Sequence, residues 1–319
     1  MFRSFFIYLS KASWAHNIVT RWSIGWRMAS RFVAGERVED AIRVIRGLNA
    51  KGINATLDHL GEHTTTKEEA IRATADIIAA LNAIQQSSVR ANISVKLTQI
   101  GLNIDKQLCA ENLKKILIEA RELNNFIRID MEDSALTQDT LDLVYAMRAK
   151  KFTNVGIVIQ AYLFRSEKDI HELIVKEIPV RLCKGAYNEP PEIAFPKKRD
   201  VDANFDRLAR LLLDGAAKLN YPPLSEDGRM PPLPALATHD ERRITYVRDY
   251  SQFIHLPDRA LEFQMLHGIR RDLQERLAAK NFPVRVYVPY GTQWYPYFMR
   301  RLAERPANIW FLLSNYFRN

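Results

Sequence analysis

From about residue 46 onward, short apolar or β-branched runs alternate with longer segments whose apolar residues recur at helical spacing. We predict eight strands: Ile53–Leu57, Asn92–Leu97, Phe126–Met131, Val155–Gln160, Pro179–Cys183, Ala235–Thr238, Leu261–Met265 and Val284–Val288. Regular alternation of strands and helices is typical of parallel strands joined by crossovers. Eight such units in about 270 residues predict an α/β fold, a (β/α)8 barrel, with a doubly wound sheet as the alternative.

Helical periodicity fills the intervals between these strands. The predicted helices are Glu68–Leu81, Cys109–Leu123, Thr137–Lys150, Glu167–Val175, Asp202–Leu219, Arg242–Phe253, Gly268–Ala279 and Trp294–Glu304. At the start of the first, Thr65 and Glu68 match the Ser/Thr-x-x-Glu capping box. The Pro-rich segment 221–234 cannot continue a helix, so we predict a loop that enters the sixth strand.

The first 35 residues differ from the rest because they contain no acidic residue, while cations interrupt a stretch rich in Phe, Trp and Ile. Those cations are Arg3, Lys11, Arg21, Arg27 and Arg31. We interpret residues 1–45 as an N-terminal helical arm and residues 46–319 as the barrel. The arm is consistent with helices docked on the barrel, with an amphipathic membrane contact and with an organellar transit peptide.

The composition excludes several classes of protein. With 47% apolar and 26% charged residues among 319, the chain is neither disordered nor collagen-like. Its two cysteines cannot form a disulfide framework or a Cys-only zinc site, and they suit a reducing cytoplasm. The sequence contains no run of 18 consecutive apolar residues, so no transmembrane helix is predicted. The net charge of +9 leaves nucleic acid, lipid headgroups or a phosphate-bearing cofactor open as partners.

Some local motifs lack the context that their chemistry requires. His59 and His63 have the H-x-x-E-H spacing of a zinc peptidase class, but this segment follows a strand and contains a glycine, so we predict a loop and no metal site. No G-x-G-x-x-G or Walker sequence is present. Cys183 lies within a predicted strand and is expected to be a packed thiol. Outside the arm, cations do not alternate with aromatic residues, so we expect no nucleic-acid partner.

Polar residues lie on or just after nearly every predicted strand. They include Lys96, Asp130, Glu132, Asp133, Gln160, Arg181, Lys184, Thr238, His239, Asp240, Glu262, Gln264 and Tyr287. Active sites of (β/α)8 barrels gather at the carboxyl ends of the strands, whereas the interior normally packs branched apolar residues. Any one of these charges is compatible with a structural ion pair, but together they predict a site. The basic run 197–199 is either a solvated surface or a partner for a pyrophosphate.

The last predicted helix carries the sharpest pattern. Tyr297 precedes Arg300 and Arg301 by three and four residues, so the three side chains share one face of the helix. Two adjacent guanidinium groups are suited to bind a carboxylate, and Glu304 follows Arg300 by one turn as a counter-ion. The alternative is a surface helix stabilised by ordinary i,i+4 pairs.

This helix, together with the segments RLCKGAYNEPPE (181–192), ATHD (237–240) and EFQMLHG (262–268), resembles the proline dehydrogenase family from about residue 57 to 308. Bifunctional relatives carry an additional aldehyde dehydrogenase module, for which we expect no room in these 319 residues beside the barrel. The chain is therefore similar to the monofunctional prokaryotic form. The resemblance implies a distorted TIM-like (β/α)8 barrel that binds FAD at the strand carboxyl ends. It also implies oxidation of L-proline to 1-pyrroline-5-carboxylate with hydride transfer to FAD, the first step of proline degradation to glutamate.

The resemblance also implies roles for individual residues. Asp130 and Arg181 match the catalytic pair, and the substrate would contact Lys96, Tyr287, Tyr297, Arg300 and Arg301. Cofactor contacts are implied for Met131, Gln160, Arg181, Lys184, Gly185, Ala186, Lys198, Thr238, His239 and Glu262.

The partners implied are L-proline, a quinone-type electron acceptor and a separate 1-pyrroline-5-carboxylate dehydrogenase. The expected location is the cytoplasm, with peripheral contact at the inner membrane through the arm. Two other hypotheses stay open: a flavin-free (β/α)8 enzyme that acts on another small carboxylate, and a non-catalytic basic module that binds nucleic acid or lipid through the arm.

Overall fold

The computed structural model describes residues 23–61 and 64–304 of the chain. Eight parallel strands follow one another in chain order and close into a barrel, because β8 pairs with β1. The strands are β1 (Asn54–His59), β2 (Ala91–Val95), β3 (Ile127–Ile129), β4 (Val155–Gln160), β5 (Val180–Cys183), β6 (Pro234–Ala237), β7 (Glu262–Leu266) and β8 (Val284–Tyr290). The predicted (β/α)8 barrel is confirmed, and the closure excludes a doubly wound sheet.

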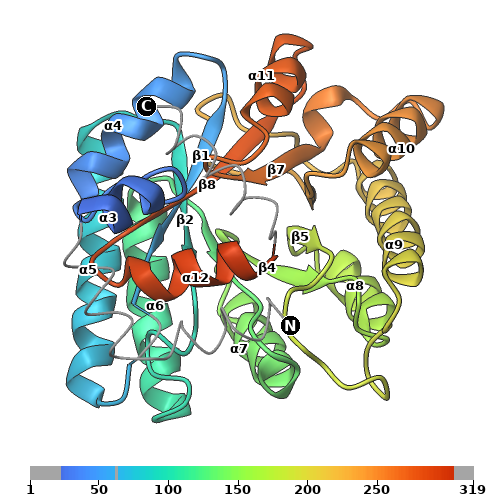
Figure 1. The fold of residues 1–319 in the computed structure, drawn as a ribbon. Coiled ribbons are helices and arrows are strands. Elements are labelled where there is room, and N and C mark those ends of the chain that lie inside the picture. Colours follow the sequence, from blue (N-terminus) through green and yellow to red (C-terminus); the bar gives the residue numbers. More distant parts are fainter. Residues whose placement is uncertain (1–22, 62–63, 305–319) are drawn as a thin grey trace.

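The helices lie around the barrel, most of them over the outer faces of its strands and the last one across one end of it (Figure 1). They are α3 (Ser23–Ala29), α4 (Val38–Asn49), α5 (Lys67–Gln86), α6 (Lys106–Glu122), α7 (Thr137–Ala149), α8 (Ser166–Val175), α9 (Lys198–Leu219), α10 (Glu241–Phe253), α11 (Arg271–Ala279) and α12 (Trp294–Glu304), with short 3-10 turns η1 (Ser134–Leu136) and η2 (Asp258–Ala260). The apolar residues between strands and helices form one continuous core of Ile, Leu, Val, Ala and Phe side chains. Burial of this core stabilises the barrel and leaves its lumen to other residues.

The capping box of α5 lies one residue later than the sequence pattern predicts. The Thr66 hydroxyl accepts a hydrogen bond from the Glu69 N–H at 3.2 Å, and the Glu69 carboxylate accepts bonds from the N–H groups of Thr66 and Thr65. Thr65 and Thr66 are adjacent in a run of three threonines, and Glu68 and Glu69 are adjacent as well, so both registers fit the pattern. The box at Thr65 and Glu68 is therefore wrong by one position.

The described part of the N-terminal arm packs on the last helix. Trp26 contacts Trp294 edge-to-face, with ring centroids 5.3 Å apart, and Phe32 lies 6.2 Å from Phe298. These residues form a second buried cluster that also includes Leu60, just after β1. The arm from residue 23 onward is thus docked on the barrel, while residues 1–22 lie outside the described residues.

The expected boundary at residues 45 and 46 falls inside α4. This helix buries Ala41, Ile42 and Ile45 and packs against β1 and β8. The second half of the arm is therefore continuous with the packing of the barrel. None of the helices in the described ranges is both long enough and apolar enough to cross a membrane.

Candidate active site

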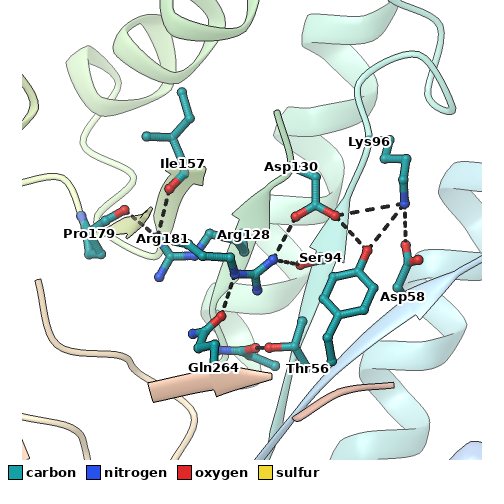
Figure 2. Close-up of polar contacts among 12 residues, drawn as sticks. Thr56, Asp58, Ser94, Lys96, Arg128, Asp130, Ile157, Pro179, Arg181 and Gln264 are labelled. Atoms are coloured by element: carbon teal, nitrogen blue, oxygen red, sulfur yellow. Dashed lines mark hydrogen bonds and ion pairs between the residues drawn. The ribbon is translucent and has the colours of Figure 1, made fainter. Parts of the chain in front are cut away.

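Side chains from strands that are not neighbours meet inside the barrel, so they must point into its lumen. Arg181 on β5 contacts Ser94 on β2, Asp130 just after β3 and Gln264 on β7 (Figure 2). The Arg181 Nη1 donates to Asp130 Oδ1 at 2.9 Å, and both side chains are largely buried. The predicted catalytic pair is thus a direct ion pair. It lies at the carboxyl end of the strands, where barrel active sites form.

Tyr287 on β8 completes this centre. Its hydroxyl donates a hydrogen bond to Asp130 Oδ2 at 2.7 Å, and the Arg181 guanidinium lies over its ring, 5.4 Å from the centroid. Burial and the nearby carboxylates of Asp130 and Asp58 raise the pKa of the Tyr287 phenol well above its usual value. The phenol therefore remains protonated and continues to donate to Asp130 across the ordinary pH range.

Lys96 follows β2 and lies beside the same centre. Its Nζ donates to Asp58 Oδ1 at 2.8 Å, is 3.4 Å from the Tyr287 hydroxyl and is 3.9 Å from Asp130 Oδ2 (Figure 2). Asp58 is 1% exposed, whereas Lys96 and Asp130 retain 12% and 13% side-chain exposure. The lysine is therefore held by a buried counter-ion and still reaches the solvent side of the site.

Asp58 and Ser94 are functional neighbours that the sequence reasoning missed. Asp58 lies two residues beyond Thr56 on β1, so both side chains share one face of the strand. A charged residue on that face of an otherwise buried strand is the signal that could have identified it. Ser94 is smaller and carries no such signal, and its role is visible only from the 3.1 Å bond with Arg181.

Most of the predicted cofactor residues line the same end of the barrel, in the turns after four consecutive strands. Those placed there are Met131 after β3, Gln160 at the end of β4, Lys184, Gly185 and Ala186 after β5, and Thr238 and His239 after β6. The Gln160 amide donates to the Glu132 carbonyl at 2.7 Å, which orients its other end. Gly185 has a φ of +109°, and a Cβ at this position would collide with the ring of Tyr162. Glycine therefore allows the turn to lie directly on that ring.

Two lysines extend this surface toward α9. Lys184 donates to Asp202 at 2.5 Å and to Asp240 at 2.8 Å, and Lys198 forms an ion pair with the other oxygen of Asp202. Lys198 is mostly exposed. The Gln160 amide and these two cations are donors of the kind that suit a phosphate-bearing cofactor, and in this structure the carboxylates of Asp202 and Asp240 balance the cations.

The residues predicted to bind a carboxylate, Tyr297, Arg300 and Arg301, lie on α12, which follows β8 directly at this end of the barrel. The Arg301 guanidinium stacks over the Tyr297 ring at 5.1 Å, so these two residues share one face as the spacing predicts. Tyr297 is buried, and Arg300 and Arg301 are partly exposed. The side chain of Glu304, expected as a counter-ion, lies outside the described residues.

Glu262 does not lie with the other predicted cofactor residues at the carboxyl ends of the strands. It is the first residue of β7, at the amino end of the strand, and it is fully buried. Its carboxylate accepts two hydrogen bonds from Arg285, at 2.8 and 2.9 Å, and one from Gln264. Arg285 also donates to the carbonyl of Gly228, in the loop before β6. This position favours a structural or indirect role over direct contact with a cofactor at the rim.

The other sequence motifs find ordinary roles. His59 ends β1 and packs its ring against Tyr290, residues 62 and 63 lie outside the described part, and the described residues contain no cluster able to hold a metal ion. Burial raises the pKa of the Cys183 thiol to about 12, which keeps it protonated and unreactive.

The family model described as proline dehydrogenase matches residues 41–313. Proline dehydrogenase 2 of Bacillus subtilis (strain 168) is 39% identical over 311 residues, covering 97% of this chain and 96% of that protein. The proline dehydrogenase of Deinococcus radiodurans is 38% identical over 296 residues, covering 91% and 90%.

Longer proteins match over part of their length. The bifunctional protein PutA of Escherichia coli (strain K12) is 27% identical over 89% of this chain, which corresponds to 24% of that protein. Among solved structures, proline utilization A of Bdellovibrio bacteriovorus, inactivated by N-propargylglycine, superposes with a TM-score of 0.78 and 25% identity. That match covers 88% of this chain and 33% of the other.

Proposed function

The chain belongs to the proline dehydrogenase family, and from this premise we propose that the carboxyl-end mouth of its barrel oxidises L-proline to 1-pyrroline-5-carboxylate. This reaction is the first step of proline degradation to glutamate. The observation that supports it most is the joined set of Asp130, Arg181, Tyr287 and Lys96, whose polar atoms lie 2.7 to 3.9 Å apart in the mouth. Hydrogen bonds and ion pairs connect these four side chains, and Lys96 and Asp130 remain partly exposed to solvent.

FAD is the cofactor that we assign to the rim. When bound, it accepts the hydride that leaves ring carbon 5 of proline. Met131, Gln160, Gly185, Ala186, Thr238 and His239 would hold it at the strand ends, with Lys184 and Lys198 near its phosphates. Arg181 would face the ring and stabilise the negative charge that reduction produces there.

The substrate carboxylate would be bound by Arg300, Arg301 and Lys96, and the proline ring would pack against Tyr287 and Tyr297. Several cations around one small anion are costly to desolvate unless opposite charges balance them. Asp58 and Asp130 supply that balance, since both lie within 4 Å of the Lys96 ammonium. These residues therefore bind and orient the reacting C–H bond, which is positioning and not acid–base catalysis.

Loss of hydride requires a neutral proline amine, so we expect activity to rise with pH from the acidic side. The raised pKa of Tyr287 keeps its hydrogen bond to Asp130 intact over the same range. A reductive half-reaction whose rate does not change with pH would contradict this assignment.

The physiological setting is also a proposal. A quinone-type acceptor in the inner membrane would reoxidise the flavin, the basic N-terminal arm would provide peripheral contact, and a separate 1-pyrroline-5-carboxylate dehydrogenase would take the product in the cytoplasm. Flotation with anionic liposomes compares the full chain with a chain that begins at Glu36. Equal binding of the two would exclude the arm as the contact.

The activity itself is tested by steady-state oxidation of L-proline with a soluble quinone, and the cofactor by its release and chromatographic identification. Arg301→Met should raise the KM for proline about 100-fold, because a bidentate charged contact is lost. Lys218→Met, on the exposed end of α9, is the matched control. A protein that stays colourless after addition of FAD would contradict the assignment and favour a flavin-free enzyme.

A further inference from the structure

We propose that Gln264 is a positioning residue that fixes the direction of Arg181, and that buried Glu262 determines which way the Gln264 amide points. The proposal rests on the function assigned above, because it concerns how Arg181 is presented to the flavin and substrate.

The contacts form one chain along the lumen from the amino end to the mouth. Gln264 Oε1 accepts a hydrogen bond from Arg181 Nε at 2.5 Å, and Gln264 Nε2 donates to Glu262 Oε1 at 2.5 Å. Glu262 and Gln264 are two residues apart on β7, so they share its inward face. Figure 2 shows Gln264 directly below the guanidinium whose other side meets Asp130 and Ser94.

The orientation of the amide follows from the chemistry of its two partners. An ionised carboxylate only accepts hydrogen bonds, and a guanidinium only donates them. Gln264 therefore satisfies both only with its NH2 toward Glu262 and its carbonyl oxygen toward Arg181. The reverse orientation would place two donors together at Arg181 and two acceptors together at Glu262.

Arg285 donates hydrogen bonds to the Glu262 carboxylate from two nitrogens, at 2.8 and 2.9 Å. Arg285 is in turn fixed by the carbonyls of Ala55 and Gly228. Both side chains are at most 1% exposed, so neither exchanges its partners with water. The acceptor that sets the Gln264 amide is therefore permanent.

The consequence is that the guanidinium of Arg181 cannot rotate. Its Nε is held by Gln264, and its Nη1 is held by Asp130 and Ser94. Nη2 makes no hydrogen bond within the described ranges, which makes it the nitrogen available to a ligand in the mouth. Without Gln264, the Nε–H would lose its acceptor and the guanidinium could turn about its bond to Asp130.

The first test is Gln264→Met in the flavin-loaded enzyme, with Arg181→Met as a reference. We expect kcat to fall about 10- to 100-fold, the effect of losing one charge-assisted hydrogen bond, while the KM for proline changes less than about threefold. The reduction potential of the bound flavin should fall toward that of Arg181→Met, because a cation aimed at the ring stabilises its reduced form.

Gln274→Met is the matched control. Gln274 is also buried and donates two side-chain hydrogen bonds, to the carbonyls of Leu266 and Ile269, but it does not contact Arg181. It should lower stability and leave the flavin potential unchanged. The same loss of potential in both glutamine variants would overturn the proposal.

The second test is Gln264→Glu, which keeps an acceptor for Arg181 but must carry a proton to donate to Glu262. The charged and titratable groups that face position 264 or its partners lie on several strands. They are Glu262 on β7, Arg285 and Tyr287 on β8, Arg181 on β5, Arg128 on β3, Asp130 just after β3, Asp58 on β1 and Lys96 just after β2. Two carboxyl groups this close share one proton, which is lost as the pH rises.

The rate of flavin reduction in Gln264→Glu, divided by that of the unmodified enzyme, should therefore fall with increasing pH. A ratio that does not depend on pH would overturn the proposal, since a purely structural role gives a constant ratio. A flavin potential unchanged in Gln264→Met but shifted in Arg181→Met overturns only this inference. A potential unchanged in Arg181→Met removes the premise as well.

Discussion

The two ends of the barrel lumen both contain charged side chains, but they hold them differently. At the amino end, Arg285, Glu262 and Arg128 are at most 1% exposed, and their partners are each other, Gln264 and backbone carbonyls. At the mouth, Lys96 and Asp130 are each more than a tenth exposed, and their partners are side chains. Charges fixed to the backbone stabilise a structure, whereas charges fixed to other side chains and open to water can exchange partners when a ligand arrives.

The same comparison explains how the site is built. The closed end supplies a rigid base, Glu262 with Arg285, and Gln264 transmits its orientation to Arg181. Gly156 leaves the space that Arg128 needs, because a Cβ there would lie 2.8 Å from the Arg128 Nη1. The side chains at the open end can then exchange partners with a ligand, while the closed end holds Arg181 in a fixed orientation.

Breaking the closed end should have the largest effect on stability. Arg285→Met leaves Glu262 as an uncompensated buried charge, so the free energy of unfolding should fall by about 3–5 kcal/mol. Urea denaturation measures it. Lys51→Met, which removes an exposed ion pair with Glu275, should cost less than about 1 kcal/mol. Equal losses in the two variants would contradict the distinction between the ends.

Lowering the pH should reduce the free energy of unfolding through a histidine at the mouth before it affects the charges at the closed end. Burial, followed by repulsion from Arg271, lowers the pKa of His267, just after β7, from 6.5 to about 4. Because the unfolded chain takes up this proton first, the contribution of His267 is complete above pH 6.5 and is lost as the pH falls toward 4. The loss amounts to at most about 3 kcal/mol.

The measurement is the free energy of unfolding as a function of pH between 4 and 7. His267→Gln should flatten its slope in that interval, and His171→Gln, at an exposed position on α8, should not. An unchanged slope in His267→Gln would show that the acid sensitivity lies elsewhere.

A change at the mouth should affect catalysis more than stability. Asp130→Asn weakens the bonds to Arg181 and Tyr287 without emptying the space, so kcat should fall about 10- to 100-fold. Stopped-flow reduction by proline measures it. Asp139→Asn, in an exposed pair with Lys106, is the control and should keep the full rate. If Asp130→Asn changed the free energy of unfolding more than the activation free energy, Asp130 would act mainly in stabilising the fold, like the charges at the closed end.

Much of the fold was predictable because strand and helix periodicities are local. All eight strands begin and end within two residues of their predicted limits, and β4 matches at both ends. The capping box of α5 was displaced because Thr65, Thr66, Glu68 and Glu69 satisfy the pattern in two registers. Only the hydrogen bonds of the folded helix distinguish the registers.

The site was predictable as a set of residues but not as a network. Polar residues at strand ends indicated the mouth, and the structure joins Asp130 to Arg181 and Tyr287 across 51 and 157 residues of sequence. Such pairings depend on barrel closure and strand register, which no local pattern contains. The resemblance implies a cofactor contact for Glu262, whereas its position as the first residue of β7 lies toward the amino end of the lumen.

The most direct test of the account is the visible spectrum of the purified protein, recorded without oxygen before and after addition of L-proline. The account predicts a yellow protein whose flavin absorbance is bleached by proline, because the mouth binds FAD and orients the substrate for hydride transfer. A yellow protein that proline does not bleach would contradict the assigned substrate. A protein that remains colourless with added FAD would contradict the assignment of the rim as a flavin site.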